Sequence, residues 1–426
     1  MAIKILATGD IHIGKKSGGI NENLDELATK HTWKRLVDYA VHNGIDVLAL
    51  SGDIVDKDNR FFEAIGPLQA GFEKLKQAGI EVFMVAGNHD FKVLSDITVS
   101  SHFDNVHLLG ESGKWEAKIY EKNGLKMQFV GWSFPTLHYK DDPFLSFTQE
   151  MIDPDIPVLG LLHGEVENPE SSYAPIEFSN LLNSGVDTWV LGHIHKPSVL
   201  NDFDPYVCYP GSPHSLSAKE TGQHGPILIS IETKERMEIK NLYFSPVRFE
   251  RLQIDITDEV DETSLRSIIT SKLSNYATEI ISELDEVIFL VLDLVFEGEH
   301  DRIQEFENWL KNLSDLNLET ESGTRILVRK TLVNLTPKLA DLLELSKQSS
   351  PVGILAKAIL ALEKGESTPF LDSLFQKWQD KQQIFNNANT YQPLRPAGML
   401  PGKNAKEYIL QECNRLISEL NLQQAQ

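Results

Sequence analysis

Short, mainly apolar runs recur along the first half of the chain, and each one stops at a polar loop. They cover residues 3–8, 47–51, 82–85, 158–163 and 189–192. Such runs are typical of strands buried on both faces, as in a parallel sheet covered by helices. The sequence therefore predicts five buried strands.

Between these runs, apolar residues recur at helical spacing. This spacing predicts helices over 24–43, 61–78 and 91–103, with Gly44 and Gly79 as C-terminal stops for the first two. Asn123-Gly124 predicts a hairpin turn between strands at 117–120 and 127–130. Stretches 206–209, 227–231 and 239–244 alternate like antiparallel strands. The first 245 residues are therefore expected to form two sheets packed face to face with helices outside.

The pattern changes after Pro246. Strands are expected at 249–256, 287–296 and 325–331, and helices at 262–276 and 302–313. Beyond Pro337 only helical signals remain, at 339–345, 352–362, 370–385 and 405–420. We predict three parts: an α/β domain over 1–245, a small α/β domain over 246–333 and a helical region over 334–426. A packed core helix is the default interpretation of 405–420, and a partner-binding helix is the alternative.

Polar residues follow the five apolar runs directly. They are Asp10, His12, Asp53, Asn88, His163, His193 and His195. In open α/β sheets, ligands bind at the carboxyl ends of the strands. Carboxylate, imidazole and amide oxygen without thiolate suit manganese, iron or zinc. The set is too large for one ion, so we expect two ions about 3.5–4 Å apart that share Asp53.

The charge balance argues against a global basic field. The formal net charge is −22, divided as −13 for residues 1–246, −10 for 247–333 and +1 for 334–426. A nucleic-acid partner would have to be held by bound ions and local cations. Candidates that follow the motif loops are Lys15, Lys16, Lys57, Arg60, Lys196 and Lys219. For each one, a solvated surface side chain is an equally good interpretation.

The start of the chain, its apolar stretches and its two cysteines predict a cytoplasmic protein without a membrane segment. The chain starts directly with a strand pattern, and its most apolar long stretch, 287–296, is too short to span a bilayer. Two cysteines, Cys208 and Cys413, do not make a disulfide framework.

The five polar motifs, taken in order, resemble those of the calcineurin-like metallophosphoesterases. The wider pattern, which includes 192–197, 209–212 and 220–222, is similar to the SbcD-type DNA-repair exonucleases and more narrowly to their YhaO-like branch. The resemblance implies a four-layer α/β/β/α sandwich with a small α/β capping domain and a helical C-terminal region. It assigns Asp10, His12, Asp53 and His195 to one ion, and Asp53, Asn88, His163 and His193 to the other.

The resemblance also implies roles beside the ions. His89 would orient the phosphate or protonate the leaving oxygen. Asp90 would either fix His89 or cap the following helix. Some relatives have His at position 56, where this chain has Asp56, which is expected to be a loop cap.

The function that the resemblance implies is a manganese-dependent DNA nuclease. It would be a double-strand 3′-to-5′ exonuclease and single-strand endonuclease, with an SMC-like coiled-coil ATPase as partner and a homodimer interface near 61–103. Two alternatives stay open: a phosphodiesterase acting on nucleotides or other small phosphoesters, and a non-catalytic scaffold subunit. The intact ligand set favours an enzyme over a scaffold.

Overall fold

The computed structural model describes residues 2–20, 25–56, 64–101, 103–234, 236–256, 260–300, 302–311, 316, 318–336, 342–387 and 405–424. The chain divides into two compact units. Unit 1 comprises Met1–Glu250, Ala277–Leu292 and Leu318–Arg329, and unit 2 comprises Arg251–Tyr276, Asp293–Asn317 and Lys330–Gln426. The division into three domains stays a prediction.

The first sheet of unit 1 has the strand order β14-β13-β1-β2-β3-β4. Its strands are β1 (Ile3–Thr8), β2 (Val47–Ser51), β3 (Glu81–Val85), β4 (Val106–Leu108), β13 (Ile227–Thr233) and β14 (Arg236–Asn241). The strands β1 to β4 are parallel, and β13 and β14 extend the sheet in antiparallel pairing. The predicted strands 3–8, 47–51 and 82–85 are confirmed. The strand predicted at 239–244 corresponds to β14, which begins and ends three residues earlier in the sequence.

The second sheet has the order β11-β12-β10-β7-β6-β5. Its strands are β5 (Trp115–Lys122), β6 (Leu125–Trp132), β7 (Val158–His163), β10 (Thr188–Gly192), β11 (Ser198–Asn201) and β12 (Tyr206–Tyr209). The predicted hairpin is confirmed, with positive φ at Asn123 and Gly124. The strand predicted at 206–209 is confirmed as β12; it is antiparallel to β11, as predicted, but it is also parallel to β10. Alternation of side chains reports burial and not strand direction.

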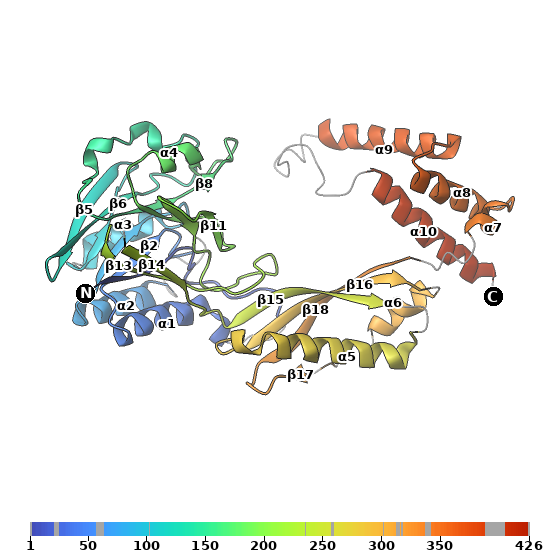
Figure 1. Cartoon of the computed structure of the whole chain (residues 1–426), viewed down its shortest axis with the longest axis horizontal. Helices are drawn as coiled ribbons and strands as arrows, with labels where there is room; N and C mark the ends of the chain where they lie inside the picture. Colours follow the sequence, from blue (N-terminus) through green and yellow to red (C-terminus); the bar gives the residue numbers. More distant parts are fainter. Residues whose placement is uncertain are drawn as a thin grey trace. The chain divides into compact units, whose positions relative to one another are not determined.

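The two sheets and their helices form four layers. The helices of this unit are α1 (Thr29–His42), α2 (Ile65–Gln77), α3 (Phe91–Ser101) and α4 (Phe178–Leu182). Leu48 and Leu50 pack with α1, α2 and α3, whereas Val47 and Ala49 pack against the second sheet. Leu181 of α4 covers the other side of that sheet. Figure 1 shows α1 and α2 beside the first sheet and α4 on the opposite side. The predicted α/β/β/α sandwich is confirmed.

Helix boundaries depend on contacts that apolar spacing does not report. The helix predicted from residue 24 begins at Thr29, after a 3-10 turn at Asp25–Leu27. The Thr29 hydroxyl donates to the carbonyl oxygen of His12 at 2.8 Å, which fixes the start of α1 against the first motif loop. The helix predicted from 61 begins at Ile65, and residues 57–63 lie outside the described part.

The remaining elements form a third sheet and a group of helices. The sheet has the order β15-β16-β18-β17, with β15 (Val247–Ile256), β16 (Phe289–Glu299), β17 (Leu318–Glu319) and β18 (Arg325–Thr336). The helices are α5 (Glu262–Glu279), α6 (Ile303–Lys311), α7 (Leu342–Ser346), α8 (Pro351–Lys364), α9 (Pro369–Asn387) and α10 (Ala405–Gln424). Ile409, Cys413 and Ile417 of α10 pack with Ile359 of α8. No helix in the described residues has both the length and the apolarity to cross a membrane.

Candidate metal centre

The seven predicted ligands lie at the carboxyl ends of five parallel strands. Asp10 and His12 follow β1, Asp53 follows β2, and Asn88 follows β3. His163 ends β7, and His193 and His195 follow β10. Because both sheets present this edge to the same region, residues far apart in sequence come together.

The loops that carry four of these ligands are strained. The φ values are 51°, 48°, 49° and 99° at Asp10, His12, Asp53 and His193, in the range that side chains disfavour. Such conformations cost about 1–3 kcal/mol each and persist only where the surroundings fix them. Here the N–H of Asp10 donates to the Gly52 carbonyl oxygen at 2.9 Å, and the N–H of His12 donates to that of Asp53 at 3.0 Å.

Glycines that precede three ligands leave no room for a Cβ atom. A Cβ at Gly87 would lie 2.2 Å from Oδ1 of Asp53. At Gly192 it would lie 2.1 Å from the carbonyl oxygen of Ser51. At Gly52 it would lie 2.7 Å from Nδ1 of His163. These glycines are therefore required by close packing of the ligand loops.

One half of the centre is built around two facing imidazoles. Nε2 of His12 lies 3.1 Å from Nε2 of His195, and the latter lies 3.9 Å from Oδ1 of Asp10. Two nitrogens bound to one ion at about 2.1 Å each are separated by about 3.0–3.4 Å. The donor atoms of Asp10, His12 and His195 all lie within 4.8 Å of one another. The arrangement therefore fits a divalent cation.

The other half contains His163, Asn88 and Asp53. Nε2 of His163 lies 3.2 Å from Oδ1 of Asn88 and 3.5 Å from Oδ2 of Asp53. The ring of His193 has its centroid 5.4 Å from that of His163. Burial first, and then His163, lower the pKa of His193 to about 4, so the ring is neutral at pH 7 and able to bind a metal. These side chains offer the donors of a second ion.

Asp53 lies between the two halves. Burial alone would raise its pKa, but His163, His12 and His89 together lower it, so Asp53 is ionised. Its side chain is 3% exposed. A buried carboxylate surrounded by imidazoles is suited to bridge two cations.

Several ligand rings are fixed by an oxygen on their far side. Nδ1 of His195 lies 3.2 Å from Oε1 of Glu220, and Nδ1 of His163 lies 3.0 Å from the carbonyl oxygen of Ser51. Such contacts fix the tautomer and the ring plane of metal-binding histidines. Sequence reasoning included Glu220 in a motif but gave it no role, and nothing in the sequence indicates that the Ser51 backbone contributes.

The surroundings of His89 differ from the prediction. The Asp90 carboxylate accepts hydrogen bonds from the N–H groups of Gly87 at 2.8 Å, Ile54 at 2.5 Å and Val55 at 3.2 Å, so it joins two motif loops. The prediction that the Asp90 side chain fixes His89 or caps α3 is therefore wrong. The carboxylate nearest to the His89 ring is that of Asp56, whose Oδ1 lies 3.2 Å from Nδ1.

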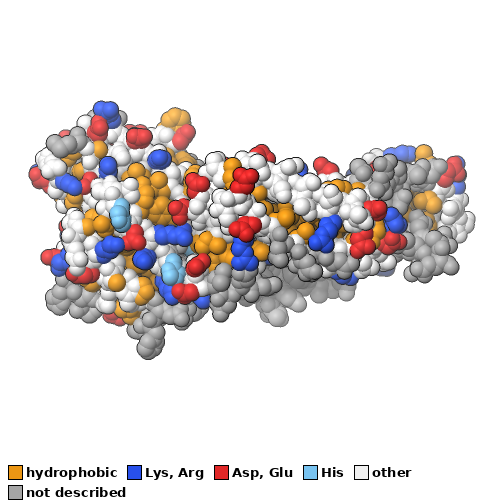
Figure 2. All heavy atoms as spheres, turned by 90° about the horizontal axis from the view of Figure 1, so that it is seen from below, with side chains coloured by type: hydrophobic (Ala, Val, Ile, Leu, Met, Phe, Trp, Pro, Cys, Tyr) orange, Lys and Arg blue, Asp and Glu red, His pale blue; other side chains and the backbone are white. Residues whose placement is uncertain are grey.

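The basic residues that were predicted to contact phosphate differ in their surroundings. Nζ of Lys15 lies 2.9 Å from Oδ1 of Asp56, within the centre. Lys16, Lys196 and Lys219 are exposed. Lys57 and Arg60 lie outside the described residues. Figure 2 shows Lys and Arg side chains interspersed with Asp and Glu on one face of the chain.

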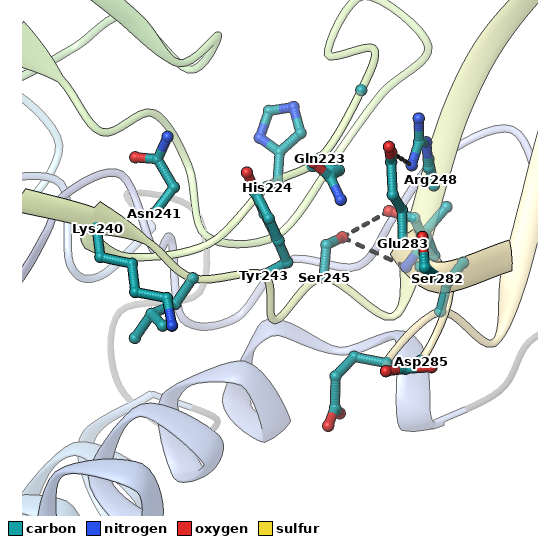
Figure 3. A pocket seen from close by; sticks show the side chains of 15 residues that line it. Gln223, His224, Lys240, Asn241, Tyr243, Ser245, Arg248, Ser282, Glu283 and Asp285 are labelled. Carbon is teal, nitrogen blue, oxygen red and sulfur yellow. Dashed lines mark hydrogen bonds and ion pairs between the residues drawn. The ribbon is translucent and has the colours of Figure 1, made fainter. Parts of the chain in front are cut away.

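A cavity of about 340 Å³ is lined by other residues of unit 1. Its wall includes His224, Tyr243 and Arg248, and Figure 3 shows Arg248 beside Glu283. The Arg248 guanidinium pairs with Glu283 at 2.6 Å and with Glu250 at 2.8 Å. None of the seven ligands lines this cavity, so it is separate from the metal centre.

Comparison with known families agrees with this geometry. Residues 3–197 match the sequence profile described as calcineurin-like phosphoesterase. This part, a little under half of the chain, is therefore similar to the calcineurin-like phosphoesterases.

The individual proteins that match this chain have low sequence identity to it. The chain is 27% identical over 281 residues to "Uncharacterized metallophosphoesterase YhaO" of Bacillus subtilis, a match that covers 64% of this chain and 68% of the relative. It is 25% identical over 238 residues to "DNA double-strand break repair protein Mre11" of Methanopyrus kandleri, covering 51% and 50%. Among solved structures, a dimetal phosphatase from Danio rerio has a TM-score of 0.35 and 14% identity, over 56% of this chain and 96% of that chain. The match to Mre11 therefore spans only about half of that protein.

Proposed function

We propose that the protein is a two-metal DNA nuclease of the SbcD type, in the YhaO-like branch. The observation that carries the proposal is Asp53, a buried carboxylate within 3.9 Å of imidazole nitrogens of His12, His89 and His163. A carboxylate shared by two ions is the centre of in-line phosphoryl displacement. Cleavage would be 3′-to-5′ on duplex ends and endonucleolytic on single strands.

In this proposal, seven side chains bind the two ions and His89 acts on the substrate. Asp10, His12, Asp53 and His195 hold one ion, and Asp53, Asn88, His163 and His193 hold the other. His89 contacts the scissile phosphate and gives its Nε2 proton to the leaving oxygen as the P–O bond breaks. When bound, the two ions activate the attacking water and neutralise charge on the phosphoryl oxygens. Manganese suits the mixed oxygen and nitrogen donors.

DNA as the substrate is supported by the likeness to Mre11, which is named as a DNA double-strand break repair protein. The exposed Lys196 and Lys219 follow motif loops and are candidates for phosphate contacts. One observation favours the second candidate, a phosphodiesterase for nucleotides or other small phosphoesters: acidic and basic side chains alternate on the face in Figure 2. An inactive scaffold is disfavoured because the ligand set is intact.

The proposal extends to partners and location. The C-terminal helices carry exposed apolar residues, Leu343, Ile354 and Leu416, which are candidates for docking on the coiled coil of an SMC-like ATPase in the cytoplasm. A homodimer would use the region 61–103, which includes α2 and α3. Light scattering that gives the monomer mass at every concentration would remove the dimer.

The deciding experiment offers the purified protein with manganese three substrates in parallel. They are duplex DNA, single-stranded DNA and bis-p-nitrophenyl phosphate. Cleavage of both DNA substrates supports the nuclease. Hydrolysis of the small diester alone supports the second candidate, and no hydrolysis of any substrate supports the scaffold.

A further inference from the structure

A single oxygen, Oδ1 of Asp56, is shared by three side chains. Nζ of Lys15 lies 2.9 Å from it, Nδ1 of His89 lies 3.2 Å and Nδ1 of His12 lies 3.6 Å. The first two are hydrogen-bond distances, and the third is a longer polar contact. The Asp56 side chain is 3% exposed, and these three groups help to orient its carboxylate.

The contact with Asp56 determines where His89 points. With Nδ1 directed at Asp56, Nε2 of His89 lies 3.9 Å from Oδ2 of Asp53, on the side where a phosphoryl group would bind. Rotation of the Asp56 carboxylate would release the His89 ring. Whatever fixes Asp56 therefore fixes His89.

The contact of Lys15 with Asp56 is the shortest of the three, and the backbone of Lys15 is held in place by hydrogen bonds. Its N–H donates to the His12 carbonyl oxygen at 3.0 Å. Its carbonyl oxygen accepts from the N–H of Thr29 at 3.0 Å and from the Thr29 hydroxyl at 3.1 Å. The Lys15 side chain is 35% exposed, so about two thirds of it is covered. Its charge is directed into the centre and not toward solvent.

A cation beside Asp56 also has an electrostatic reason. Asp10 and Asp53 place further carboxylates in the same buried region. An unpaired buried carboxylate is costly, and loss of its partner favours a different rotamer or protonation. Burial alone would raise the pKa of Asp56, but contacts with His12, His89 and Lys15 lower it, so the group is ionised.

We propose that Lys15 is a positioning residue of the centre: by holding the Asp56 carboxylate it fixes the ring of His89, and it does not bind a DNA phosphate. This inference rests on the phosphodiesterase centre of the proposed function and not on DNA as the substrate.

The test compares Lys15→Gln with Lys30→Gln, a matched control. Lys30 is 36% exposed and pairs with Asp25 at 2.7 Å, away from the ligand loops. With manganese and bis-p-nitrophenyl phosphate, Lys15→Gln is expected to lower kcat about tenfold, the lower end of what loss of an outer contact costs. KM and manganese binding by calorimetry should stay within about twofold, because no ligand changes.

A double-mutant cycle with Asp56→Asn tests whether Lys15 acts on kcat through Asp56. If Lys15 acts through Asp56, Lys15→Gln has no further effect on kcat in the Asp56→Asn background. An equal loss in both backgrounds overturns the inference. So does a rise in KM with kcat unchanged, which identifies direct substrate binding, or a loss of manganese, which identifies support of a ligand.

A readout without turnover separates this inference from the proposed function. In metal-free protein labelled with ¹⁵N-histidine, the His89 ring should carry a proton on Nδ1, and Lys15→Gln should change that signal while Lys30→Gln does not. If wild-type protein hydrolyses no diester, the proposed function fails and the spectrum still decides whether Lys15 positions His89. An unchanged His89 signal in Lys15→Gln overturns the inference.

Discussion

The backbone N–H of His89 donates to Oδ1 of Asp53 at 2.9 Å, which leaves Oδ2 as the oxygen that faces the imidazoles. Nε2 of His163 lies 3.5 Å from Oδ2, and Nε2 of His12 lies 3.9 Å from it. The loop that follows β3 therefore orients the carboxylate that follows β2. One oxygen is held by the fold, and the other is free to bridge two ions.

Asp53→Asn and His89→Gln should fail in different ways. Asp53→Asn removes the bridging charge and should lose both ions. His89→Gln keeps all ligands and should retain both ions while losing about 10²–10⁴-fold in kcat, the usual contribution of a proton donor. Plasma emission gives the metal content, and a chromogenic diester gives the rate. Equal metal loss in both variants would contradict the assigned roles.

Glu220→Gln should weaken one ion and spare the other. Glu220 contacts His195 and none of the donors of the second ion, and loss of such a carboxylate weakens metal binding about 10–100-fold. Manganese calorimetry should then resolve one tight and one weak site. Glu238→Gln, at an exposed position of β14, is the control and should bind as wild type. Weakening of both sites together would show that Glu220 supports the whole centre.

Gly87→Ala should abolish metal binding, because its Cβ would lie 2.2 Å from Oδ1 of Asp53. Gly66→Ala is the control, since nothing lies within 4 Å of the Cβ position in α2. The control should keep its metal, and its free energy of unfolding should change by no more than about 1 kcal/mol, because Gly66 lies in the first turn of α2 and precedes Pro67. Thermal unfolding and metal titration measure both effects. Normal metal content in Gly87→Ala would disprove the packing argument.

Stability should fall in acid because of His214. Its ring accepts from the Thr32 hydroxyl at 2.7 Å and donates to Ser17 Oγ at 2.7 Å, since that hydroxyl donates to the Ser215 carbonyl oxygen. Burial lowers the pKa of His214 to about 3, so the unfolded chain binds the extra proton between about pH 6.5 and 3. The free energy of unfolding should therefore drop by about 1.4 kcal/mol per pH unit below pH 6.5 from this group.

Denaturant titrations at several pH values test the His214 prediction. His214→Gln, which keeps a donor and an acceptor, should show a shallower acid slope than wild type. An identical slope would assign the acid sensitivity to other groups.

DNA binding should depend on salt through Lys196 and Lys219. Replacing both with Ala should reduce the slope of log K against log salt by about 0.9 per lost phosphate contact. Lys126→Ala is the control, because Lys126 lies near the start of β6, at the opposite end of the strands from the motif loops. Fluorescence anisotropy at a series of salt concentrations measures the slope. An unchanged slope would mean that these lysines are solvated surface groups.

The sequence by itself determined the strands and the ligand types. Residues 47–50 are all apolar because both faces of β2 are covered, and Asp53 follows because polar ligands belong at the strand end. Both signals are local, so residue order and polarity are sufficient to read them. The same locality explains why the hairpin at Asn123 was predicted correctly.

Only the tertiary structure decided which groups support the ligands. Asp56 contacts His89 and Lys15, Asp90 joins two loops, and Glu220 holds His195 across 25 residues. A carboxylate that caps a loop and one that orients a histidine have the same sequence context, because their difference lies in distances between segments. The direction of β12 and the start of α1 at Thr29 were decided in the same way, by contacts with distant residues.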